Sequence, residues 1–230
     1  MDNIEKIESR AIMFNFERIW PSAPYILEGI GVTLQIVAGA AIIGIILGIL
    51  LALCKIGKVA PLRWFANFYT SIFRGTPLVL QLMLAYYALP QLLNIQLEPI
   101  TAAIIAFGLN SGAYISEIIR GGINAVDKGQ VEAAKALGIP YAKTMKDIIL
   151  PQAIKNILPS LMNEFITLNK ESAIVTVVGA LDIMRRAYIV GGDKYTYFEP
   201  LLIAGAIYYV MTLILTFLGS LLEKRMRRSD

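Results

Sequence analysis

The 230-residue sequence is strongly apolar: 57% of its residues are hydrophobic, 17% are charged and its mean hydropathy is +0.63. Soluble domains usually contain roughly 45–50% apolar and about 25% charged residues, so the composition predicts one membrane-embedded domain. The absence of histidine excludes metal sites and proton relays built on imidazole, and the single cysteine, Cys54, excludes an internal disulfide. The net charge of +4 is modest and its basic residues fall in loops and the tail, which suits lipid headgroups; no nucleic-acid partner is expected.

The N-terminal stretch, residues 1–24, is predicted to be separate from the membrane domain. Acidic residues interrupt it, and it lacks the early apolar run of a signal peptide. Ile4, Ile7, Ala11 and Phe14 share one helical face, which predicts an interfacial helix lying on the membrane surface; a frayed polar terminus is the alternative. Residues 25–230 are expected to form a single transmembrane domain.

Five charge-poor blocks predict an all-α membrane protein with about five transmembrane helices. The first, residues 29–53, contains no charge and exceeds the ~30 Å hydrocarbon core at ~1.5 Å per residue. The others cover residues 75–97, 99–116, 148–169 and 200–222. Near the start of the second block, Arg74, Gly75, Thr76 and Pro77 predict a fixed cation and a bend. Residues 173–181 are apolar but too short for a span, which predicts a re-entrant or partial helix.

Small residues recur every fourth position in the first block, at Ala40, Gly44, Gly48 and Ala52. This spacing predicts a ridge on which another helix packs closely. We expect the partner helix to belong to the same subunit and not to a second copy.

An odd number of spans places the two termini on opposite sides of the membrane. If the charged insert between the third and fourth blocks lies inside with the C-terminal tail, 12 Lys and Arg residues lie inside and 6 outside. The bias of basic residues therefore predicts an N-terminus outside, a cytoplasmic C-terminus and a cytoplasmic insert.

That insert begins with a helix-compatible run, Glu132, Ala133 and Ala134, and breaks at the helix-ending pair Gly138 and Pro140. A helix and a tight turn between two membrane blocks predict a protruding surface that another protein grips. From composition alone, an ordinary solvated loop is the alternative.

The order of residues in the insert follows the pattern EAA-x3-G-x9-I-x-LP, which ends at Pro151. This pattern resembles the cytoplasmic EAA loop of binding-protein-dependent ABC importer permeases. Three further runs are similar to the polar amino-acid branch of that family, the histidine, glutamine and arginine permeases: residues 73–77 (FRGTP), 110–122 (NSGAYISEIIRGG) and 169–174 (NKESAI). The resemblance extends from about residue 29 to the C-terminus.

The resemblance implies a type I importer permease in which a cytoplasmic coupling helix, within residues 128–144, seats in a groove of a separate ATPase. The coupling residues that it implies are Glu132, Ala133, Ala134, Gly138, Ile139 and Pro140. Its implied partners are two copies of an ATP-binding cassette ATPase, a second permease subunit (identical or homologous), and an extracytoplasmic amino-acid-binding protein. The implied location is the bacterial cytoplasmic (inner) membrane.

The chain itself is not expected to be an enzyme or to hold a cofactor. It contains no G-x-x-x-x-G-K-[ST] phosphate loop, so ATP and Mg²⁺ are expected in the partner ATPase.

Polar residues within the third and fourth blocks predict the substrate pathway. In the fourth block Asn156, Ser160, Asn163, Thr167 and Lys170 share one helical face, and in the third block a similar face carries Asn110, Tyr114 and Glu117. Unmatched polar groups cost several kcal/mol each in hydrocarbon, so these faces must meet other helices or a wet cavity. The candidate pathway residues are Asn110, Tyr114, Glu117, Ser160, Asn163, Glu164, Thr167 and Lys170.

A zwitterionic amino acid needs an anion for its ammonium group and donors for its carboxylate. Glu117 and Glu164 are candidates for the first role, and Asn110, Asn163, Ser160 and Lys170 for the second. The alternative is that Glu117–Arg120 and Lys170–Glu171 pairs only tie helices together.

The predicted function is half of the translocation pathway of an ATP-driven importer of polar L-amino acids. The alternatives are the same architecture with another small polar solute, such as cystine or an opine, or a secondary transporter. The second alternative usually shows inverted repeats, and no such halving is visible in the sequence.

Overall fold

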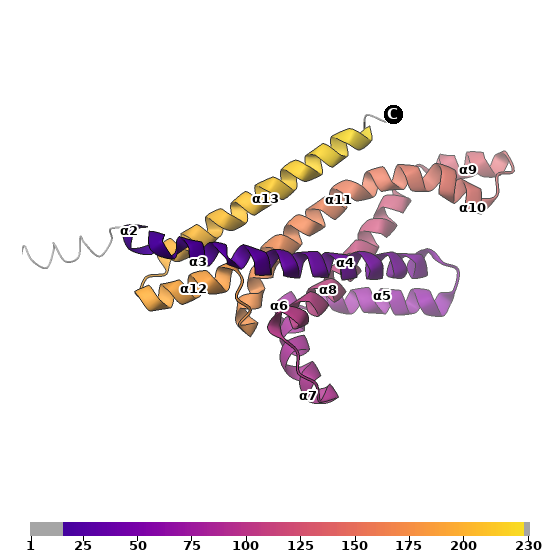
Figure 1. The fold of residues 1–230 in the computed structure, drawn as a ribbon. Helices are drawn as coiled ribbons and strands as arrows, with labels where there is room; N and C mark the ends of the chain where they lie inside the picture. Colours follow the sequence, from indigo (N-terminus) through magenta and orange to yellow (C-terminus); the bar gives the residue numbers. More distant parts are fainter. Residues whose placement is uncertain (1–15, 228–230) are drawn as a thin grey trace, which may run out of the picture.

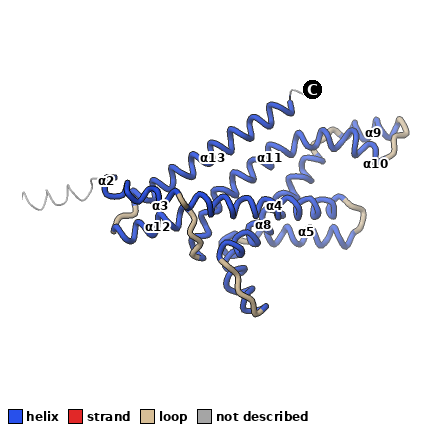
Figure 2. The backbone as a smooth tube through the Cα atoms, in the orientation of Figure 1, coloured by secondary structure: helices blue, strands red, loops and turns tan. Residues whose placement is uncertain are grey.

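The computed structural model describes residues 16–227, and the regular structure within that range is helical (Figures 1 and 2). The predicted interfacial face, from Ile4 to Phe14, lies outside the described residues. The described N-terminal part consists of the short helices α2 (Phe16–Ile19), η1 (Trp20–Ser22) and α3 (Ala23–Leu27).

Among the described residues, three helices are long and apolar enough to cross a membrane: α4 (Gly29–Ile56), which continues from α2 and α3, α8 (Pro99–Asn124) and α13 (Phe198–Arg227). They contain the first, third and last predicted blocks, because each of those blocks is free of charge, and α8 continues beyond the third block through Glu117 and Arg120. Figure 1 shows that α9 and α10, the turn after α4 and the C-terminal end of α13 lie at one end of the bundle, while α2, α3 and α12 lie at the other.

The bend predicted near the start of the second block, at residues 74–77, is present, but the helix that precedes it was not predicted, and the block's own helical part ends at Leu93 and not at Leu97. The structure has α5 (Ala60–Gly75), followed by a segment bent 103° from it. That segment comprises α6 (Leu78–Met83), the π-helix η2 (Leu84–Ala88) and α7 (Leu89–Leu93). Thr76 and Pro77 are extended between the two parts, with ψ angles of 148° and 135°. A proline disfavours helical geometry at the residue before it, which explains the break.

The charged insert forms two short helices, α9 (Lys128–Ala136) and α10 (Tyr141–Thr144). The chain then continues through the π-helix η3 (Met145–Ile149) into α11 (Leu150–Glu171). At ~1.5 Å per residue the 22 residues of α11 would cross the hydrocarbon core, but its polar face keeps it below the hydropathy of a lipid-facing span.

By length and composition, three helices and one bent pair qualify as spans within residues 16–227; a fifth, α11, therefore stays a prediction. The short apolar stretch after α11 forms the 3₁₀-helix η4 (Ser172–Val178), which agrees with the predicted partial helix. The helix α12 (Ile183–Lys194) follows.

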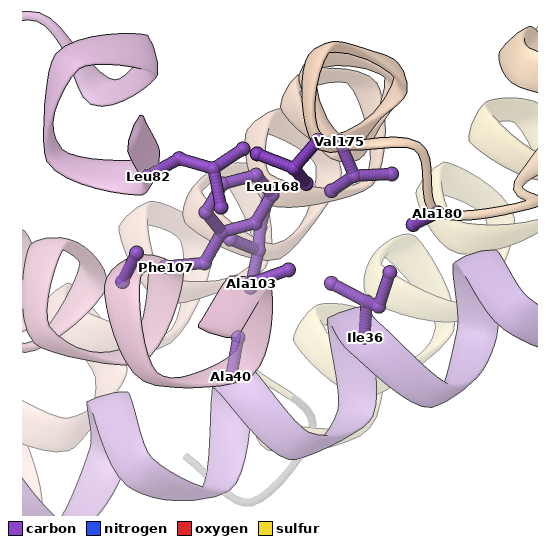
Figure 3. Packing of buried hydrophobic residues seen from close by; sticks show 10 residues of the cluster. Ile36, Ala40, Leu82, Ala103, Phe107, Leu168, Val175 and Ala180 are labelled. Atoms are coloured by element: carbon purple, nitrogen blue, oxygen red, sulfur yellow. The ribbon is translucent and has the colours of Figure 1, made fainter. Parts of the chain in front are cut away.

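The core is built where α4 packs along α8. Buried Ile36 and Ala40 of α4 meet Phe107 of α8, and Leu168 and Val175 cover them from the end of α11 and from η4 (Figure 3). The predicted small-residue ridge faces α8 within the same subunit, because Gly44 lies against Ser111 and Gly48 against Ile115. The prediction of packing inside one subunit is confirmed.

Adding a methyl group on this ridge is expected to destabilise the protein. A Cβ at Gly48 would lie 2.5 Å from Cγ2 of Ile115, which is buried and cannot retreat. We expect Gly48→Ala to cost about 1–3 kcal/mol by overpacking, measured as a lower unfolding temperature of the purified protein in detergent. Gly31→Ala is the control, because nothing lies within 4 Å of a Cβ at Gly31 on the same helix. Equal unfolding temperatures for the two variants would contradict the packing described here.

Candidate coupling loop and translocation face

The hairpin of α9 and α10 owes its shape to residues at its helix ends. Asp127 caps α9 by accepting a hydrogen bond from the backbone N–H of Gly129 at 2.8 Å. After α9 the chain reverses at Gly138, whose φ of +73° is left-handed and favours glycine. The N–H of Ile139 donates to the carbonyl of Ala134 at 2.9 Å, and extended Pro140 leads into α10. The predicted break at Gly138 and Pro140 is confirmed.

The predicted coupling residues differ in exposure. Glu132, Ala133, Gly138 and Pro140 are exposed, Ile139 is half-buried, and Ala134 is buried against the hairpin. The hairpin therefore offers a surface from α9 and the turn, with Ala134 supporting it from inside.

Sequence reasoning missed two apolar side chains at the tip of this hairpin. Leu137 is 79% exposed and Tyr141 is 65% exposed. The sequence feature that could have revealed the first of them is the position of Leu137, a large apolar residue directly before the turn glycine Gly138. Exposed apolar side chains on an otherwise polar hairpin are typical of a surface that another protein covers.

Asn110, a predicted pathway residue, holds the bend between α5 and α6. Its amide nitrogen donates to the carbonyl of Phe73 at 2.9 Å and to Oε1 of Gln81 at 3.0 Å. Gln81 in turn donates to the carbonyls of Phe73 and Thr76 at 2.9 and 3.1 Å. These amides satisfy carbonyl groups that the helix break leaves without helical partners, so both hydrogens of the Asn110 amide are already used.

Glu117, the predicted ammonium site, is neutralised by three cations. Lys55 forms an ion pair with it and also donates to the hydroxyl groups of Thr70 and Ser116, at 3.0 and 3.1 Å. The other carboxylate oxygen of Glu117 accepts from Arg120 at 2.6 Å. Arg74 is the third cation, 4.0 Å from the same oxygen. This geometry favours the alternative in which Glu117 ties helices α4, α5 and α8 together.

Tyr114 lies between these two clusters on α8. Its side chain is 37% exposed, and the guanidinium of Arg74 lies over its ring, 5.3 Å from the centroid.

The polar residues of α11 do not all serve one surface. Half-buried Glu164 accepts a hydrogen bond from Ser111 of α8 at 2.8 Å. Asn163 instead lines a groove of about 230 Å³ between α11 and α13, together with Thr216 and Ser220. Of the other predicted residues, Thr167 is half-buried and Ser160 and Lys170 are exposed in the single chain.

Comparisons with known proteins agree with this architecture. A family model described as the binding-protein-dependent transport system inner membrane component matches residues 44–228. The arginine transport system permease protein ArtQ of Bacillus subtilis is 61% identical over 216 residues, which cover 94% of this chain and 99% of ArtQ. The glutamate/aspartate import permease protein GltK of Escherichia coli is 38% identical over 92% of this chain and 98% of GltK.

A crystal structure of an amino acid ABC transporter with histidines has a TM-score of 0.88 to this chain at 45% identity, and the match covers 93% of this chain and 100% of the other. The family match and the relatives, like the apolar helices, indicate a multi-pass protein of the inner membrane. The chain belongs to the binding-protein-dependent transport system inner membrane components, as the permease subunit of an amino-acid ABC importer.

Proposed function

We propose that this chain forms half of a translocation pathway for polar L-amino acids and takes its power from a separate ATPase that docks on the α9–α10 hairpin. The observation that supports this most directly is the hairpin itself, which projects at one end of the bundle (Figure 1). Its side chains Leu137 and Tyr141 are exposed. The sequence has no phosphate loop, so ATP and Mg²⁺ belong to the ATPase.

The complete importer then contains two ATPase subunits, two permease subunits and an extracytoplasmic binding protein. The hairpin and the C-terminus lie in the cytoplasm and the N-terminus lies outside, which the distribution of Lys and Arg favours. Closure of the ATPases on ATP draws the two hairpins together and turns the pathway from inward- to outward-facing.

Within the polar class, a cationic amino acid is the cargo that the charges of α11 favour. Glu164 and Glu171 are half-buried and seven residues apart, so they lie on one face of the helix. Within residues 16–227 no Lys or Arg nitrogen lies within 4 Å of either carboxylate, which leaves both able to attract a cation. The relative ArtQ is named for arginine transport, which points to the same class, whereas the more distant GltK is named for acidic amino acids.

Uptake by the reconstituted importer tests this function. Proteoliposomes containing the permease and its ATPase, supplied with the binding protein outside and ATP inside, are expected to accumulate labelled L-arginine in preference to L-glutamate. ATP-dependent uptake of cystine or an opine, without uptake of L-arginine, would show that the proposed cargo is wrong and that the proposed ATP-driven mechanism is right. Uptake that needs no ATPase would overturn the proposal in favour of a secondary transporter.

Removing the charge of Glu164 is expected to weaken transport without detaching the ATPase. Glu164→Gln keeps a hydrogen-bond acceptor for Ser111 but removes the anion, so the KM for L-arginine uptake should rise roughly tenfold. The control is Glu98→Gln, which changes an exposed carboxylate at the start of α8. If Glu164→Gln also lowered recovery of the ATPase with the permease, its role would be structural.

A further inference from the structure

Arg74 is an arginine within the bent span whose hydrogen-bonding capacity is unused. It lies in the last turn of α5, directly before the bend, and 45% of its side chain is exposed. Its guanidinium stacks over Tyr114 and stands 4.0 Å from Glu117, but it donates no hydrogen bond to any group within residues 16–227. Arg120, by contrast, donates two hydrogen bonds to Glu117.

The charged groups around Glu117 include more cations than anions. Lys55, Arg74 and Arg120 surround the single carboxylate of Glu117. The Lys55 side chain is 1% exposed and fully hydrogen-bonded, and Arg120 holds the second carboxylate oxygen. The surplus positive charge therefore resides on Arg74, with five N–H donors available. A charge left exposed within a membrane domain is costly, which marks a functional site.

Arg74 and Glu164 contact side chains one turn apart on α8, of which Tyr114 is exposed and Ser111 is buried against α4. On one side Tyr114 lies beneath the guanidinium of Arg74 on α5, and on the other Ser111 donates to Glu164 on α11. Ser111 and Tyr114 are three residues apart, a rise of about 4.5 Å along the helix. A cation from α5 and an anion from α11 thus contact neighbouring turns of α8, and a zwitterion carries one charge for each of them.

We propose that Arg74 binds the α-carboxylate of the transported amino acid, with Tyr114 as the positioning residue that holds the guanidinium. This inference rests on the proposed amino-acid cargo and adds a carboxylate site to it. A planar guanidinium binds a carboxylate through two parallel N–H···O hydrogen bonds, which no amide or ammonium group reproduces. Two of the earlier candidates are less suited, because the Asn110 amide hydrogens are used at the bend and Asn163 faces the α13 groove.

The test compares ligands that differ only in the carboxylate. The assembled complex of permease and ATPase, in nanodiscs and without the external binding protein, is titrated with L-arginine and its decarboxylated form agmatine. L-glutamine and its decarboxylated form, 4-aminobutanamide, serve as a second pair. Arg74→Gln should weaken binding of an amino acid roughly 10- to 100-fold and leave binding of its amine unchanged or stronger. Arg63→Gln, an exposed arginine on the same helix, is the matched control and should change neither.

Other outcomes decide against the inference. Equal losses for amino acid and amine, or wild-type affinity of Arg74→Gln for the amino acid, would overturn it. If Arg74→Gln fails to assemble, Arg74→Lys is the second variant, because it keeps the positive charge but loses the two parallel N–H donors of the guanidinium. It should still weaken binding of the amino acid, about three- to tenfold, and leave binding of the amine unchanged. Failure of the wild-type complex to bind either amino acid would also overturn the inference. ATP-driven uptake in the presence of the binding protein is measured in parallel, and it shows whether the proposed function holds independently of the Arg74 site.

Discussion

Replacing Leu137 with glutamate is expected to uncouple the importer by releasing its ATPase. Leu137 is the most exposed large apolar side chain of the α9–α10 hairpin, at 79%, and it directly precedes the left-handed turn at Gly138. An apolar anchor that fills a pocket of a partner typically contributes 2 kcal/mol or more to binding, and a buried charge in its place adds a desolvation cost. We therefore expect Leu137→Glu to weaken ATPase binding by at least roughly 30-fold.

The measurement is co-purification of the ATPase with tagged permease, followed by uptake in proteoliposomes. Membrane insertion and the unfolding temperature of the permease should be unchanged, because the side chain has little contact within its own chain. Leu92→Glu is the control: Leu92 is 82% exposed on α7, away from the hairpin (Figure 1). An ATPase that stays bound to Leu137→Glu would count decisively against docking at the hairpin tip.

Glu117→Gln is expected to be the most destabilising conservative change in the described bundle. It removes the anion that compensates Lys55, a side chain only 1% exposed. Breaking a buried ion pair by removing one partner typically costs about 3–5 kcal/mol, because the remaining charge stays buried. The loss should appear as a lower unfolding temperature of the purified protein in detergent.

A double-mutant cycle separates this effect from a simple loss of contacts. Lys55→Met alone should cost less than Glu117→Gln, because Glu117 keeps Arg120 as a partner. Adding Lys55→Met to Glu117→Gln should then restore part of the lost stability, because no buried charge is left unpaired. Lys58→Met, at an exposed position three residues further on, is the control. Additive costs in the double mutant would show that the two groups are not coupled.

Local sequence patterns were sufficient to predict much of this fold. The helices α4, α8 and α13 follow from uninterrupted apolar runs, and the ridge at Gly44 and Gly48 follows from four-residue spacing. The chain reversal at Gly138 could be predicted because a left-handed backbone conformation at a turn favours glycine. Each of these features depends on residues that are close in the sequence.

The features that the sequence analysis missed depend on tertiary contacts. The pairing of Lys55 with Glu117 joins positions 62 residues apart, so no local pattern reveals it. The helix before the bend, α5, was not predicted because Arg63 and Arg74 interrupt its apolar run, although both side chains are exposed. On α11, Asn163 and Glu164 are neighbours in the sequence, yet they face different helices, and only the packed structure separates their roles.

The polar flank of α11 has a consequence for biosynthesis. Ser160 and Lys170 are exposed when the chain stands alone, and acyl chains cannot solvate them without a cost of several kcal/mol for each uncompensated group. An orphan subunit would draw water into the bilayer or be removed by quality-control proteases before it found its counterpart. Its cellular abundance should therefore follow that of its assembly partners more closely than its own rate of synthesis.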